Sequence, residues 1–199
     1  MSEMMLEYTV NSIRWGNEHI LKVTRDLSPE QFTWRPGPQA PPIGWHLWHV
    51  ARWEDRVRTA FPVHDGPPRV QIWEQEELTL RYELDPAELG LLQCGEGMAH
   101  EAAARLPHEI GQENILDYAS RSFAAMDAAL GELTVADVEL VKPNCRPYTV
   151  SEDGRVVSAP ARVGPVFGEL TFLFNHDLRH LGMIEAIRGA QEMHGTATA

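Results

Sequence analysis

Four long segments in which apolar residues recur every three or four positions constrain the fold of this 199-residue chain most strongly. That spacing is the signature of an amphipathic helix, whose apolar stripe must be buried against another element. The segments run roughly from Met4 to Leu27, Ile43 to Phe61, Glu113 to Leu133 and Gly168 to Gly189. No alternation of strands and helices interrupts them. The sequence therefore predicts an all-α fold, an antiparallel four-helix bundle in a single domain over residues 1–199.

The connections between these segments are long and irregular. The first, LSPEQFTWRPGPQAPP, is rich in proline and is predicted to be a loop. The segment before the last helix carries a turn signal at Asp153-Gly154 between short β-type runs, which favours a short β-hairpin. Connections of this kind lie at the ends of a bundle, where they can cover a site.

Composition excludes several classes of function. The net charge is −12, and no cluster of lysines or arginines offers the basic patch that nucleic-acid binding requires. The two cysteines, Cys94 and Cys145, form no CxxC pair, which fits a reducing compartment. Neither a signal peptide nor an apolar stretch of about 18 residues is evident. We expect a cytoplasmic protein with no nucleic-acid or membrane partner.

Two histidines stand on the apolar stripe of the last helix. In FNHDLRHLGMIEAIRG, His176 and His180 are four residues apart and therefore share a face with the neighbouring leucines and isoleucines. A buried imidazole leaves a donor and an acceptor to satisfy, and two adjacent ones double the problem. A shared metal ion resolves it, and so do hydrogen bonds to the backbone or to water. The spacing alone leaves both interpretations open.

The second helix supplies a third ring from PPIGWHLWHVARWEDR. With Val50 at the centre of its buried arc, His46 lies about 40° away and His49 about 100° away, so periodicity favours His46. His49 stays open because Trp45, Trp48 and Trp53 make this helix apolar over much of its circumference. Such a helix can be buried on two sides, for instance against the bundle core and a partner in a homodimer.

With these residues placed, the chain resembles the DinB-like superfamily of metal-binding four-helix bundles. The resemblance rests on the proline loop, on the stretch WHLWHVARWE and on the terminal HDLRH, in that order along the chain. It implies that one histidine of the second helix and both histidines of the last helix bind a divalent metal ion (Zn, Ni or Fe). By the family pattern the second-helix ligand is His49, with His46 as the alternative.

The resemblance also implies candidate chemistry. Relatives include transferases and isomerases that use a low-molecular-weight thiol, and a similar three-histidine iron site occurs in ergothioneine-biosynthesis enzymes. Those iron enzymes carry HxxxHxE in the last helix, where this chain has Gly182 instead of the glutamate. Glu54, Asp177 and Arg179 are expected to orient the ligands or a substrate.

Three protein ligands leave a coordination position open, as in catalytic metal sites. The leading hypothesis is a metal-dependent enzyme that activates a thiol for transfer to a small-molecule electrophile. The alternatives are a non-catalytic metal- or ligand-binding bundle, a metal-dependent hydrolase and a three-histidine iron protein. No P-loop, GxSxG or HExxH motif supports a further class. The thiol of Cys94 pairs with no recognisable base and is expected to be inert.

Overall fold

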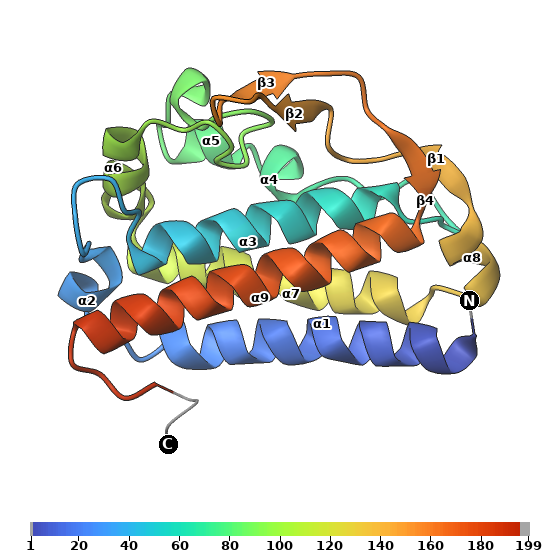
Figure 1. Cartoon of the computed structure of the whole chain (residues 1–199), viewed down its shortest axis with the longest axis horizontal. Helices are drawn as coiled ribbons and strands as arrows, with labels where there is room; N and C mark the ends of the chain where they lie inside the picture. Colours follow the sequence, from blue (N-terminus) through green and yellow to red (C-terminus); the bar gives the residue numbers. More distant parts are fainter. Residues whose placement is uncertain (1, 196–199) are drawn as a thin grey trace.

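The computed structural model describes residues 2–195, and its framework is a bundle of four long helices (Figure 1). These are α1 (Glu3–Thr24), α3 (Ile43–Val57), α7 (Gln112–Gly131) and α9 (Phe167–Ala190). Their bounds lie within a few residues of the predicted ones. Helices α1 and α9 run in one direction, and α3 and α7 run in the opposite direction (Figure 1). The mainly helical, DinB-like fold class expected from the sequence is confirmed.

Local sequence sets where these helices begin and end. The Ser2 side chain accepts a hydrogen bond from the Met5 amide and so caps the start of α1. Helix α3 continues into a 3₁₀ turn, η1 (Arg58–Ala60), and Pro62 follows shortly after. Gly111 precedes α7 with φ +87°, a conformation that few other residues adopt at low cost.

The connection between α3 and α7 is long because these two helices run in the same direction, so the chain must return to the starting end of the bundle. It lies along one side of α3 (Figure 1). It contains α4 (Ile72–Gln75), α5 (Leu78–Arg81), η2 (Pro86–Glu88) and α6 (His100–Ile110). The other connections hold α2 (Pro29–Thr33) and α8 (Val135–Glu139).

The expected β-hairpin is present before α9. Strand β2 (Tyr148–Val150) pairs with β3 (Val156–Ser158) in an antiparallel ladder around the predicted turn. Outside it, β1 (Val141–Pro143) pairs with β4 (Val163–Pro165), also antiparallel. The two ladders form an arm that reaches towards the α3–α7 connection (Figure 1).

The tryptophan-rich helix α3 is buried on two sides within one chain. Trp48 and Trp53 are both fully buried, Trp48 among bundle residues and Trp73 of the connection, Trp53 beside Phe172 of α9. The second apolar side of α3 is therefore covered by the chain's own connection rather than requiring a partner chain.

The apolar core consists of two clusters that meet along α3 and α9. Leu170 and Leu173 belong to one cluster, whereas Leu181 and Ile184 belong to the other. The histidines of α9 lie between them in sequence. Within residues 2–195, no helix is long and apolar enough to cross a membrane.

Candidate metal centre

Histidine rings from α3 and α9 meet inside the bundle. The side chains of His49, His176 and His180 each offer a nitrogen, and these nitrogens all lie within 4.8 Å of one another. The three residues are 5, 5 and 6% exposed. Because α3 and α9 are adjacent and antiparallel, residues that are 127 or more positions apart in the sequence face one another.

Hydrogen bonds fix the tautomers of two of these rings. Nδ1 of His49 donates to the carbonyl oxygen of Cys94, and Nδ1 of His176 donates to Oδ1 of Asp177 at 3.0 Å. Each Nε2 then carries a lone pair rather than a proton. These two Nε2 atoms lie 3.0 Å apart. Two lone pairs facing each other at that distance repel unless a cation or a proton lies between them.

The separation fits a shared metal ion. Two imidazole nitrogens that bind one ion at about 2.1 Å with an angle of about 90° would be about 3 Å apart. Neutral imidazole is also the form of histidine that binds metals. The donor set and its geometry are therefore compatible with a divalent metal.

Burial keeps these rings neutral. It lowers the pKa of His176 to about 3 and that of His46 to about 4. Burial lowers the pKa of His49 and His180 well below the usual range, and the neighbouring imidazoles add to the effect. The four imidazoles are therefore uncharged, and the three of His49, His176 and His180 each keep a nitrogen lone pair that can bind a cation.

His46 lies beside the three-histidine cluster rather than in it. Its Nδ1 forms a hydrogen bond with Nδ1 of His180 at 2.9 Å, and the residue is 3% exposed. When His180 donates this bond, its Nε2 lone pair is left for the cluster. The periodicity was right that His46 points inward. The periodicity favoured His46 over His49, but His49 is also buried, because α3 is covered on both sides.

Comparison with known proteins identifies the family. The sequence matches the DinB superfamily over residues 12–184. The chain belongs to the DinB superfamily. A solved structure of a conserved protein from Enterococcus faecalis is similar in fold, with a TM-score of 0.64 and 16% sequence identity, covering 94% of this chain and 96% of the other. No functionally curated protein matches the sequence.

In this DinB-superfamily member, the three residues expected to orient the ligands or a substrate differ in how they interact with the histidine cluster. Asp177 contacts His176 directly. Glu54 is fully buried near Asp177, where burial and then the charge of Asp177 raise the pKa of Glu54 well above its usual range. Burial also raises the pKa of Asp177 to about 8. The two carboxyls thus favour a state in which at least one is protonated. Arg179 is exposed, and its charge contributes to the lowered pKa of His176.

Glu96 is a site residue that the sequence did not reveal. Its Oε1 lies 3.7 Å from Nε2 of His49 and accepts a hydrogen bond from Nε1 of Trp53 at 2.7 Å. Its Oε2 is buried and has no hydrogen-bond partner among residues 2–195. Burial raises the pKa of this carboxyl to about 8. Glu96 lies in an irregular connection with no periodic pattern, and only the flanking glycines of CGEGM hint at a tight turn.

Cys94 contributes its backbone rather than its thiol. Its side chain is fully buried, and burial raises the pKa of the thiol to about 11, so the thiolate is disfavoured at neutral pH. At Gly182, where the iron enzymes carry a glutamate, the residue is exposed and an added Cβ would meet no atom within 4 Å.

Proposed function

We propose that this DinB-superfamily protein binds a divalent metal ion through His49, His176 and His180, and that it uses the site to transfer a low-molecular-weight thiol to a small electrophile. The observation that carries the metal proposal is the pair of Nε2 atoms that face each other 3.0 Å apart in a buried cluster, with the Nδ1 atoms of both rings on oxygen acceptors. Hydrogen bonds satisfy the outer nitrogens, and a metal ion between the rings would satisfy the inner ones.

Different residues of the chain orient the metal ligands and contact the substrate. Asp177, the Cys94 carbonyl and His46 orient the three rings through their Nδ1 atoms. A divalent ion held there supplies Lewis acidity, which lowers the pKa of a thiol or water that it binds. Glu96 offers its Oε2 for a hydrogen bond to a group of the substrate. The metal is zinc, nickel or iron, and the three-histidine set does not select among them.

One observation favours a second candidate, a metal-binding bundle without catalysis. The three rings are between 5 and 6% exposed, and this burial suits a closed site as well as it suits a reactive one. The two candidates make opposite predictions about access of a small thiol to the ion.

Cobalt substitution separates them. We expect the d–d spectrum of the cobalt-loaded protein to change when L-cysteine is added, because the thiol enters the inner coordination sphere. The matched control is L-serine, which should leave the spectrum unchanged. An unchanged spectrum with L-cysteine, together with no faster conjugation of thiols to a panel of electrophiles by the zinc- and nickel-loaded protein, would reject the transferase proposal and leave the binding role.

A further inference from the structure

A loop that joins two parts of the α3–α7 connection is pressed against the histidine cluster. We call residues 90–97 the 90–97 loop. Its backbone closes on itself, because the amide of Leu91 donates to the carbonyl of Glu96 at 2.8 Å and that of Gly95 donates to Leu89 at 2.9 Å. The loop places two groups at the cluster, the Cys94 carbonyl on Nδ1 of His49 and the Glu96 carboxyl near its Nε2.

The backbone of this loop is strained in the way that functional loops often are. Leu92 and Gln93 adopt φ values of +60° and +51°, which are uncommon for residues with side chains. Gly95 has φ +97°, and a Cβ added there would lie 2.7 Å from Nδ1 of His49. The same Cβ would lie 2.9 Å from Trp45, whose ring stacks on that of His49 with centroids 4.6 Å apart. Only glycine at position 95 lets the loop carbonyl approach the imidazole so closely.

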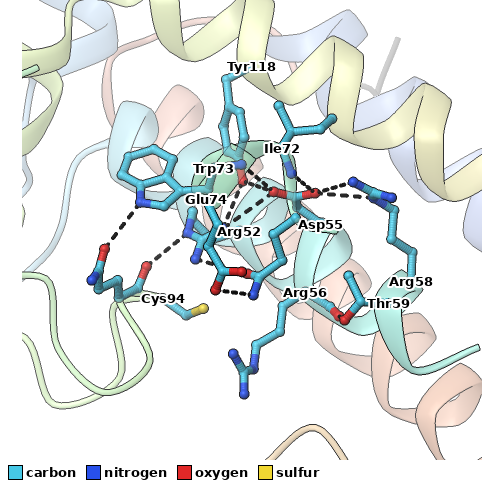
Figure 2. A network of polar contacts seen from close by, with 12 residues as sticks. Arg52, Asp55, Arg56, Arg58, Thr59, Ile72, Trp73, Glu74, Cys94 and Tyr118 are labelled. Atoms are coloured by element: carbon cyan, nitrogen blue, oxygen red, sulfur yellow. Dashed lines mark hydrogen bonds and ion pairs between the residues drawn. The ribbon is translucent and has the colours of Figure 1, made fainter. Parts of the chain in front are cut away.

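A buried arginine holds the strained residues in place. Nε of Arg52 donates to the carbonyl of Gln93 at 2.9 Å, one residue before Cys94. The side-chain oxygen of Gln93 accepts from Thr79 at 2.7 Å and from Trp73 at 3.2 Å. Figure 2 shows Arg52 between the carboxylate of Asp55 and the segment that carries Cys94.

The same arginine is itself fixed. It is 1% exposed, its other nitrogens donate to Tyr118 at 3.1 Å and to Gln71 at 3.2 Å, and its guanidinium lies over the Trp73 ring at 4.8 Å. Arg52 is also only three residues after His49 on α3. One helix therefore carries both the imidazole and the group that places that imidazole's hydrogen-bond acceptor.

We propose that Arg52 and Gly95 are positioning residues for the metal centre: Arg52 fixes the 90–97 loop, and the loop fixes the tautomer and orientation of His49. The inference rests on the proposed metal-binding function. It assigns the Arg52 network a role beyond stability, because the hydrogen bond to Cys94 keeps the proton on Nδ1 and leaves Nε2 of His49 available as a donor atom.

Two quantities are measured separately to test this: the tautomer of His49 in the metal-free protein and the dissociation constant for zinc. In long-range ¹H–¹⁵N imidazole spectra, we expect His49, assigned by its loss in His49→Ala, to carry its proton on Nδ1. Gly95→Ala should shift this tautomer and weaken zinc binding about tenfold or more, since outer hydrogen-bond partners of metal ligands are typically worth that much. Arg52→Lys keeps a cation beside Asp55 but loses the Nε donor, and should produce a smaller change of the same kind.

Two variants serve as controls. Gly66→Ala also replaces a glycine of positive φ, but its Cβ would meet no atom within 4 Å. Tyr118→Phe removes a different partner of Arg52, and should lower the melting temperature without changing the tautomer or the zinc dissociation constant. A wild-type tautomer and a zinc dissociation constant within twofold in folded Gly95→Ala and Arg52→Lys would overturn the inference, and so would equal weakening by Tyr118→Phe. If the wild-type protein binds neither zinc nor nickel, the proposed function fails, and the tautomer spectra still decide how His49 is positioned.

Discussion

Helix α3 carries two buried polar clusters that differ in one respect. In the first, Asp55 accepts hydrogen bonds from Arg58 at 2.8 Å, from Tyr118 at 3.0 Å and from the amides of Ile72 and Trp73 at 2.9 and 3.0 Å (Figure 2). In the second, the Nε2 atoms of His49 and His176 face each other 3.0 Å apart, while the Nδ1 atoms of both rings lie on oxygen acceptors. The first cluster is complete as it stands, whereas a metal ion would complete the second. A buried polar group that is satisfied stabilises a fold, and one that is not satisfied indicates a ligand.

Breaking the complete cluster should have the largest effect on stability. Asp55→Ala leaves Arg52 and Arg58 without their common carboxylate and removes the acceptor of two backbone amides. We expect a loss of about 3–5 kcal/mol in the free energy of unfolding, as for other broken buried ion pairs, measured by urea denaturation. The zinc content of the folded fraction should fall much less than the stability, because Nε of Arg52 keeps its hydrogen bond to the Gln93 carbonyl. Equal loss of zinc and stability would show that the two clusters cannot be separated.

Adding metal should stabilise the protein through the incomplete cluster alone. Free zinc at about 100 times its dissociation constant should raise the free energy of unfolding by about 2.7 kcal/mol, because it binds the folded state. The gain should vanish in His176→Ala and persist in Tyr118→Phe, as followed by thermal unfolding with and without zinc. A similar gain in His176→Ala would place the zinc elsewhere on the chain.

The pH dependence of the metal-free protein should come mainly from the histidine cluster. The folded-state pKa values of His46 and His176, about 4 and 3, lie below the value of about 6.5 expected in the unfolded chain. The unfolded state therefore binds protons first as pH falls, so stability is fully present above about pH 6.5. It should fall below that pH by about 1.4 kcal/mol per pH unit for each buried histidine.

Glu96 should change the pH dependence of stability in the opposite direction. Its folded-state pKa of about 8 exceeds the usual carboxyl value, so its contribution is present at low pH and is lost as pH rises towards 8. Denaturation midpoints from pH 4 to 8 would separate the two effects, with His46→Ala reducing the acid-side slope and Glu96→Gln flattening the alkaline side. An acid-side slope unchanged in His46→Ala would contradict the assignment of a neutral, buried His46.

Periodicity predicted the helices well because α1, α7 and α9 each bury a single apolar stripe. The spacing of His176 and His180 placed both rings inside for the same reason. The second helix was harder, since burial on two sides removes the phase information that would distinguish His46 from His49. Neither Glu96 nor the Cys94 carbonyl could be predicted, because an irregular loop brings them to the cluster and one of them acts through its backbone. The only feature of the sequence that relates to the parallel direction of α3 and α7 is the length of their connection.

The measurement that most directly tests the metal centre is elemental analysis of untagged protein, wild type beside His49→Ala, His180→Ala and His46→Ala. The account predicts about one divalent ion per chain in the wild type and in His46→Ala, and almost none in His49→Ala and His180→Ala. Metal lost in His46→Ala but kept in His49→Ala would contradict it and would show that His46, not His49, is the metal ligand from α3.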